Sequence, residues 1–180
     1  MKNVFLFLTA VLIPVGVFAG PSEPFNMSIA PDIAIYGRTT TIEGVTLSIW
    51  GENPQTSLAL GIVNGCTGDS AGLNAGMLVN YADHYKGVQW APVNYTQHDS
   101  VGWDNGFINY TEKMMSGLLT GVVNVSAQLK GVQFGFINYV DTTDDGVQIG
   151  IINIIRSNRD WFGDLSSGLA PVMIFVNWGM

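Results

Sequence analysis

Two histidines and the aspartates beside them are the residues of this chain best suited to chemistry. Asp83 precedes His84, and Asp99 follows His98. Imidazole nitrogens and carboxylate oxygens are common ligands of zinc and other transition metals. If the recurring segments that contain them stack in a solenoid, the two histidines lie near one another, but a metal centre needs three or four such donors at one point. We therefore favour exposed polar loop residues, and we predict no metal ligand.

The acidic residues are a second candidate for binding chemistry. Several of them lie in polar segments that recur between apolar ones: Asp69, Asp83, Asp99, Glu112, Asp141, Asp144 and Asp145. Calcium requires several oxygens that converge on one point, and no glycine-aspartate signature of a calcium-binding coil accompanies these acids. The glycine-rich phrases lack the Lys-Ser/Thr of a phosphate loop. We interpret the acids as a solvated face and predict no catalytic, cofactor-binding or metal-binding residue.

Recurring tyrosines and asparagines give two further candidates. Tyr81, Tyr95, Tyr110 and Tyr139 each follow an asparagine. Aligned aromatic rings can bind sugar or protein, or line a membrane interface, but we favour simple packing of a turn. Asn-x-Ser/Thr glycosylation motifs occur at Asn94, Asn109 and Asn124. We attribute these motifs to the recurrence of the surrounding sequence.

All of these residues are placed by a sequence repeat with a period of fifteen. The clearest copies begin at Gly131 and Gly146, with Gly-Val-Gln-Phe-Gly-Phe-Ile-Asn and Gly-Val-Gln-Ile-Gly-Ile-Ile-Asn. Looser copies begin at Ser57, Gly72, Gly87, Gly102 and Gly117. A short and regular period is typical of a repeat architecture.

Each repeat predicts one β-strand followed by a turn. Counted from the leading glycine, apolar residues at +1, +3 and +5 alternate with glutamine and glycine at +2 and +4, which indicates a strand with one apolar face. Position +6 is again apolar, and we expect a bend there that turns this side chain inward. An asparagine follows in every copy: Asn64, Asn80, Asn94, Asn109, Asn124, Asn138 and Asn153. One extra residue precedes Asn80, which we interpret as a β-bulge. Asparagine suits turns, and stacked copies of it can form an amide ladder.

Two all-β architectures fit this pattern. In a β-solenoid, each fifteen-residue repeat is one coil with a circuit of roughly 50 Å, stacked ~4.8 Å from the next around a thin apolar core. In an antiparallel outer-membrane-type β-barrel of about ten strands, +1, +3 and +5 face lipid while glycine and glutamine face the lumen. We favour the solenoid for two reasons. Every copy has the same turn residues, whereas the up and down strands of a barrel should make the repeats alternate in pairs. The strands are also short for the ~9–11 residues that span a bilayer.

The chain divides into four segments. Residues 1–19 have a basic start, an apolar stretch and small residues before Gly20, which predicts a signal peptide cut after Ala19. We expect an N-terminal capping segment over 20–43, tandem repeats over 44–154 and a C-terminal capping segment over 155–180. Cys66 is the single cysteine, so it forms no disulfide within the chain, and we expect a buried core residue.

Composition excludes some partners. The formal net charge is −7, with seven basic and fourteen acidic residues. Nucleic-acid binding requires clustered Lys and Arg, so we expect no nucleic-acid partner.

The phrase Gly-x-Gln-x-Gly-x-x-Asn behind a signal peptide resembles the bacterial surface-repeat family, which consists of exported envelope proteins built from tandem copies of such a phrase. The resemblance covers Gly44 to Asn153; the copy at Gly87 has Ala91-Pro92 in place of a glycine, and the copy at Gly117 has no glutamine. It implies a surface or outer-membrane location and no established chemistry.

We therefore expect a non-enzymatic, exported protein of the cell envelope with a structural or binding role and no cofactor. Its partner would be an envelope or surface component, protein or glycan, or the outer membrane itself. The alternative is a small outer-membrane barrel that acts as a pore or anchor. An enzyme on a β-helix, such as a polysaccharide lyase, would need clustered acids and bases that the sequence lacks.

Overall fold

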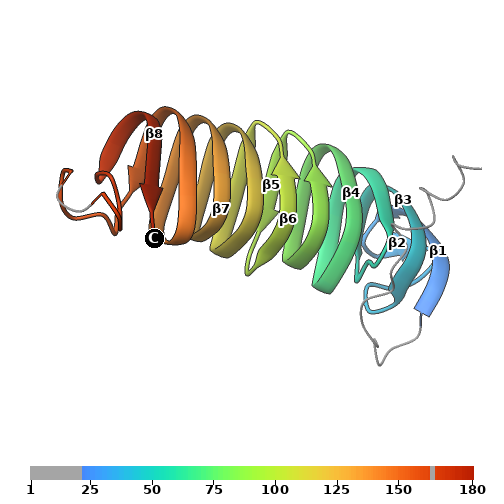
Figure 1. The fold of residues 1–180 in the computed structure, drawn as a ribbon. Coiled ribbons are helices and arrows are strands. Elements are labelled where there is room, and N and C mark those ends of the chain that lie inside the picture. Colours follow the sequence, from blue (N-terminus) through green and yellow to red (C-terminus); the bar gives the residue numbers. More distant parts are fainter. Residues whose placement is uncertain (1–21, 163–164) are drawn as a thin grey trace, which may run out of the picture.

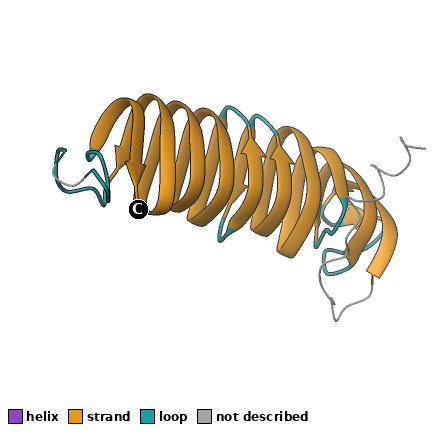
Figure 2. Ribbon diagram, in the orientation of Figure 1, coloured by secondary structure: helices purple, strands orange, loops and turns teal. Residues whose placement is uncertain are grey.

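The chain folds into a β-solenoid whose coils stack along one axis (Figure 1). The computed structural model describes residues 22–162 and 165–180, and no helix occurs among them (Figure 2). The predicted all-β solenoid is confirmed. The alternative, an antiparallel barrel of about ten strands, is wrong, because equivalent strands of successive repeats pair in parallel. The predicted signal peptide, residues 1–19, lies outside the described residues.

The strands follow the coils, and two of them pass through several corners without a break. Their bounds are β1 Ser22–Ala30, β2 Ile33–Ala34, β3 Thr41–Asn53, β4 Leu58–Trp90, β5 Val93–Thr96, β6 Ser100–Asn105, β7 Ile108–Ile155 and β8 Val172–Gly179. β4 ends at Trp90, where Ala91-Pro92 replaces the usual glycine. Proline has no backbone N–H for a strand ladder, so the pairing stops there and resumes in β5.

Equivalent residues lie directly over one another. Gly87 pairs with Gly102, and Gly102 pairs with Gly117. Asn94 pairs with Asn109 in the same way. The predicted in-register stacking of fifteen-residue units is therefore confirmed.

The leading glycines are required by the backbone. Gly72, Gly87, Gly102, Gly117 and Gly131 have φ between 112° and 144°, a region that residues with a Cβ rarely adopt. A Cβ at each of these positions would also overlap the backbone of the equivalent residue one coil earlier. Close stacking of the coils therefore depends on glycine at this position.

The interior of the coils is polar, which is the reverse of what the sequence led us to expect. Gln133 and Gln148, at position +2, are fully buried, whereas Phe134 and Phe136 are 56% and 57% exposed. The expected thin apolar core is therefore wrong for most of the stack. The expected inward bend at +6 is also wrong, since Ile137 and its equivalents Ile108 and Ile152 are 40–44% exposed.

Hydrogen bonding between coils accounts for this inversion. In a stack of identical strands, an interior amide can donate to and accept from its own copy in the next coil, which an apolar side chain cannot do. The glycine at +4 gives these amides room: a Cβ on Gly121 would lie 2.8 Å from Nδ2 of Asn109. Amide and glycine positions therefore share the inner face, and the apolar positions are left outside.

The asparagine ladder is confirmed. Each asparagine from Asn64 to Asn138 donates from Nδ2 to Oδ1 of the next one, over distances of 2.8–3.2 Å. All seven ladder asparagines are buried. The second N–H reaches a backbone carbonyl, as from Asn109 to the oxygen of Thr120 at 2.9 Å. The ladder thus joins successive coils along the whole repeat region.

Among the described residues, buried apolar side chains form two small clusters inside the coils. One consists of Met115, Leu119, Leu129, Val140 and Ile155 in the later coils. The other consists of Cys66, Ala82 and Tyr85 in the earlier coils. Burial of Cys66, which we predicted, is confirmed.

Antiparallel strands cover both ends of the stack. β1 pairs in parallel with β3 and is itself paired antiparallel with β2. β8 runs antiparallel to the last part of β7. An exposed strand edge invites pairing with another chain, so these strands protect the ends of the solenoid.

Candidate functional site: an apolar ridge along the solenoid

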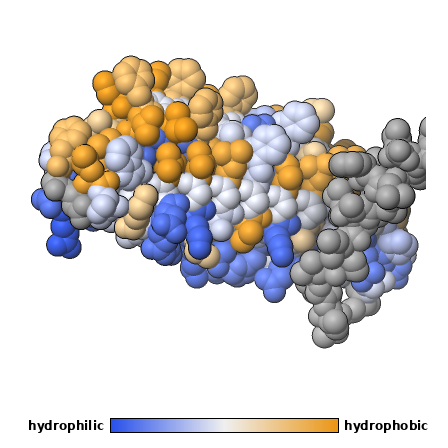
Figure 3. Space-filling view, in the orientation of Figure 1, coloured by the Kyte–Doolittle hydropathy of each residue, from blue (hydrophilic) through white to orange (hydrophobic). Residues whose placement is uncertain are grey.

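One corner of every coil presents two consecutive apolar side chains to the outside. Positions +5 and +6 both point outward because the ladder asparagine that follows them points inward. We call this corner, with its continuation in the end strands, the apolar ridge: Ile49, Trp50, Ile62, Val63, Met77, Leu78, Val79, Pro92, Val93, Phe107, Ile108, Val122, Val123, Phe136, Ile137, Ile151, Ile152, Ile174 and Phe175. Figure 3 shows apolar side chains gathered along one edge of the solenoid, most densely over β7 and β8.

The ridge is exposed or half-buried along its length and carries no charged residue. Phe107 is 66% exposed and Ile151 is 53% exposed. The extra residue before Asn80, interpreted from the sequence as a bulge, is accommodated on the ridge, where Met77 and Leu78 are both exposed while Asn80 keeps its register with Asn94.

The ridge continues into both end strands, where the repeat sequence is lost. In β3, Trp50 pairs with Val63 of the next coil, and 47% of its surface is exposed. In β8, Phe175 pairs with Gly150, has φ 70° and is 71% exposed. A non-glycine residue in the left-handed region is uncommon and is enriched at functional sites. The apolar surface is therefore a feature of the whole solenoid and not only of the repeat.

Charged residues lie on the opposite edge, in the segments that link one coil to the next. Figure 3 shows the corresponding hydrophilic edge. Ion pairs here are few and exposed, as between Arg156 and Asp141 at 3.2 Å. The predicted acidic segments thus lie away from the ridge, and the cross-section of the solenoid is amphipathic.

Aromatic residues with hydrogen-bonded polar tips lie between the ridge and the charged edge. Tyr95 and Tyr110 stack with ring centroids 5.8 Å apart. The hydroxyl of Tyr95 bonds to Glu112, which raises the pKa of Tyr95 to about 12. The Tyr139 hydroxyl donates to Asp141 at 2.8 Å in the same way.

A further aromatic group extends this border into the N-terminal coils. The indole N–H of Trp50 donates to the Tyr81 hydroxyl at 3.0 Å, and Tyr81 donates to Glu52 at 2.7 Å. Sequence reasoning aligned the tyrosines but missed Trp50 and Glu52, because they lie in a degenerate copy of the repeat.

The two histidines meet, as the stacking of linkers predicted. The rings of His84 and His98 stack with centroids 4.6 Å apart, and Nδ1 of His84 lies 3.8 Å from Oδ2 of Asp99. The carboxylates have other partners, because Asp83 accepts from the N–H of Gly68 and Asp99 from that of Met114. No group of three or more His, Cys, Asp or Glu side chains that could hold a metal occurs within residues 22–162 and 165–180.

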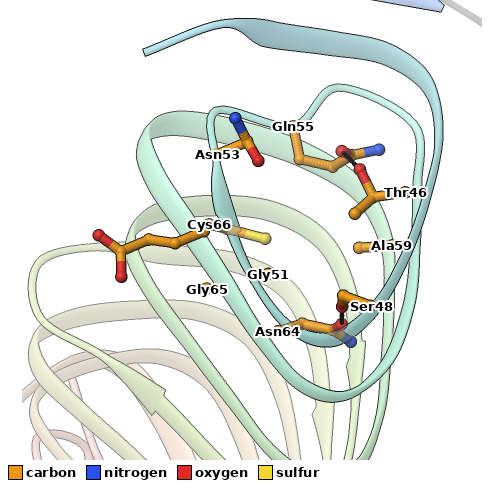
Figure 4. A pocket seen from close by; sticks show the side chains of 10 residues that line it. Thr46, Ser48, Gly51, Asn53, Gln55, Ala59, Asn64, Gly65 and Cys66 are labelled. Carbon is orange, nitrogen blue, oxygen red and sulfur yellow. Dashed lines mark hydrogen bonds between the residues drawn. The ribbon is translucent and has the colours of Figure 1, made fainter. Parts of the chain in front are cut away.

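Inside the N-terminal coils lies a small polar cavity of about 10 Å³ (Figure 4). Thr46 donates to Gln55 at 2.7 Å and Ser48 to Asn64 at 3.0 Å along its walls. Burial raises the pKa of the Cys66 thiol, which faces this cavity, to about 12. The space suits a single water molecule, so it cannot admit a substrate.

One buried acid interrupts the interior amides. Asp104 occupies position +2 and accepts hydrogen bonds from Ser100 at 2.9 Å and Gln89 at 3.2 Å. Burial raises its pKa to about 6. Sequence reasoning did not single it out, although its register with Gln89 was readable from the repeat.

A larger and open cleft of about 460 Å³ lies at the C-terminal end. Its lining is mostly polar: Thr142, Thr143, Ser157, Asn158, Arg159, Asp160, Ser167, Gly168 and Met180. These residues belong partly to a segment without the repeat, so the repeat pattern did not indicate a cleft.

Comparisons with known proteins found no match among protein-family models, curated proteins or solved structures. In the described part of the chain, no helix has the length and apolar character needed to cross a membrane. The apolar ridge is therefore the feature on which a functional interpretation can be built.

Proposed function

We propose that this is an exported, non-enzymatic protein of the cell envelope that attaches to another envelope component through its apolar ridge. The observation that carries the proposal is the ridge itself: a continuous, uncharged apolar surface on a solenoid whose interior is largely polar. Exposed apolar surfaces of this extent mark interaction sites in soluble proteins.

The outward apolar residues do little for the folded interior. The coils are joined by backbone pairing, by the asparagine ladder and by interior amides, as where Gln148 donates to Gln133 at 2.7 Å. Phe107 and Phe136 leave more than half of their surface in solvent. Because the fold does not bury these side chains, contact with something outside the chain explains them better than packing does.

Three features of the sequence support an envelope location. The apolar segment at residues 1–19 has the pattern of a signal peptide. The repeat phrase resembles that of exported surface-repeat proteins. The −7 net charge is unsuited to nucleic acid but suits a protein that faces an envelope surface with its uncharged side. The role as a pore is not proposed, since it required a barrel.

Cell fractionation tests the proposal. The tagged protein, expressed in a bacterium, should be found in the envelope fraction, with a mass that corresponds to loss of residues 1–19. A ridge variant with Phe107→Ser, Phe136→Ser and Ile151→Ser should be processed equally but released as soluble protein. A control with Gln97→Ser, Lys113→Ser and Lys130→Ser, three exposed residues of the linking segments, should stay in the envelope. Unprocessed protein in the cytosol would contradict the proposal.

A further inference from the structure

We propose that the partner of the ridge is the surface of a lipid bilayer, along which the solenoid lies with its ridge inserted between the headgroups. This inference rests on the proposed function and names the partner. The alternative occupant is a second copy of the chain; three features of the ridge favour lipid, and a fourth indicates the kind of lipid.

The backbone of the ridge is already hydrogen-bonded within the solenoid. The N–H of Phe107 donates to the carbonyl of Pro92 at 2.8 Å, and the carbonyl of Phe107 accepts from Val122 at 2.9 Å. A backbone group that enters lipid without a partner costs several kcal/mol, which excludes irregular loops from apolar depth. A stack of parallel coils avoids that cost, because each corner bonds to the corners on both sides of it.

The profile of the ridge is uneven. Along position +5, the bulky Phe107 is followed by the small Val122 and then by the bulky Phe136. A second copy would need a matching profile to reach the packing density of a protein interface. Fluid lipid adapts to protrusions of any size, so the irregular heights favour a bilayer.

The border of the ridge has the chemistry of a membrane interface. Tyr95, Tyr139 and Trp50 each present an apolar ring and a hydrogen-bonded polar tip. Tyrosine and tryptophan are enriched at headgroup level for this reason. Around each coil, an apolar corner is followed by an amphipathic aromatic residue and then by a charged linker. This spatial order matches the change in polarity from lipid to water.

The charge distribution indicates the kind of lipid. Surfaces that bind anionic lipid carry clustered Lys and Arg next to the apolar part. The ridge itself contains no basic residue, and Arg38 and Arg156, which lie beside its aromatic border, are each paired with a carboxylate, Glu52 and Asp141. The chain is acidic overall. Recognition should therefore depend on apolar insertion, and uncharged zwitterionic lipid is the expected surface.

Depth-dependent fluorescence quenching in vesicles tests this inference. Bimane is attached to Val122→Cys on the ridge or to Gln97→Cys on the charged edge; Cys66 is buried and does not compete for the label. The vesicles consist of phosphatidylcholine with brominated acyl chains. We expect quenching at residue 122 to exceed that at residue 97 by at least about threefold, because only the ridge enters the acyl region.

Equal quenching at the two positions, or no quenching at either, would overturn the inference. Because each label reports only its own surroundings, a protein that binds lipid through residues 1–19 alone would also show no difference between the two positions. The ridge variant F107S/F136S/I151S, whose outward positions leave the ladder intact, should bind these vesicles at least about tenfold more weakly than the Q97S/K113S/K130S control. If the protein instead fails to bind vesicles and forms a dimer that is lost in the ridge variant, the inference is wrong and the partner is a second copy of the chain. If the protein neither binds vesicles nor dimerises, ridge-dependent attachment in the envelope fractionation would still stand, so the two proposals fail separately.

Discussion

Replacing Asn109 by leucine should destabilise the solenoid strongly, because it removes the central member of the ladder. Asn109 accepts from Asn94 at 2.8 Å, donates to Asn124 at 2.8 Å and donates to the carbonyl of Thr120 at 2.9 Å. The Thr120 carbonyl keeps a second donor, the N–H of Gly106. Asn94 loses one of its acceptors, and Oδ1 of Asn124 loses its donor, in a site that is fully buried.

The cost follows from these two groups. The unpaired Oδ1 of Asn124 costs about 1–3 kcal/mol, and the bond lost by Asn94, whose Nδ2 keeps the carbonyls of Ala91 and Asn105, costs about 1 kcal/mol. The free energy of unfolding should therefore fall by about 2–4 kcal/mol, which for a chain of this size corresponds to a drop in Tm of about 4–16 °C. Thermal and urea unfolding, followed by far-ultraviolet circular dichroism, measure both quantities.

Asn105→Leu is the matched control. Asn105 lies at the outward position +3, where other coils carry Leu60 and Phe134, and its side chain accepts a bond from Thr120 at 2.7 Å. Loss of that part-exposed bond should cost no more than about 1 kcal/mol. If N109L and N105L unfold together, the ladder does not stabilise the fold and our reasoning about the interior is refuted.

Three further predictions concern the backbone and the buried groups. Gly117→Ala should destabilise the protein by more than about 2 kcal/mol in urea unfolding, since a Cβ there meets the backbone of Gly102 at positive φ, whereas Gly37→Ala, with open space around it, should be neutral. Asp104→Asn should stabilise the protein by up to about 3 kcal/mol at pH 7 and by little near pH 4. The pKa of Asp104 is about 6 in the folded protein and 3.8 in the unfolded chain, so the stability of the unmodified protein falls as the pH rises between these two values. Equal gains at both pH values would contradict this reasoning. Cys66, whose pKa burial raises to about 12, should resist alkylation by iodoacetamide at pH 8 until urea unfolds the chain, and rapid labelling of the native protein would show that it is not buried.

The repeat period was enough to predict the stacking of the coils. Asparagines at fifteen-residue spacing could be aligned without a structure, and the same alignment brought His84 next to His98. The glycines at position 0 were visible as a pattern, although their positive φ became clear only from the close approach of Gly102 to Gly117. The register was therefore predictable from the spacing, and the fold from the identical turn residues of every copy together with the short strands.

The direction of the side chains was not predictable from alternation. A period of two shows that Phe134 and Phe136 share a face, but it does not say which face is inside. A usable signal existed: apart from Asp104 and Leu119, positions +2 and +7 carry amides or small residues, although charged residues are frequent in the linkers. Uncharged polar residues at fixed positions indicate a buried hydrogen-bonded column. Our expectation followed the general rule that apolar residues are buried, and that rule does not hold for these coils.

The apolar ridge could not be predicted from the sequence for the same reason. Its residues looked like core, so only the burial of Gln133 and Asn138 showed that Phe136 and Ile137 are outside. The end strands added Trp50 and Phe175, which no repeat pattern identified. The candidate site was therefore identified from the structure, while the repeat positions +5 and +6 define which residues of each coil belong to it.

Disulfide trapping between outward positions tests the stacking and the orientation most directly. Ile108 and Val123 occupy position +6 of adjacent coils, about 4.8 Å apart along the stack, which suits a disulfide. The double variant Ile108→Cys and Val123→Cys should form an intrachain disulfide on mild oxidation of the folded protein. Ile108→Cys with Ile137→Cys, two coils apart at about 10 Å, should not. A disulfide in the second variant but not in the first, detected by mass spectrometry of the monomer, would contradict the solenoid described here.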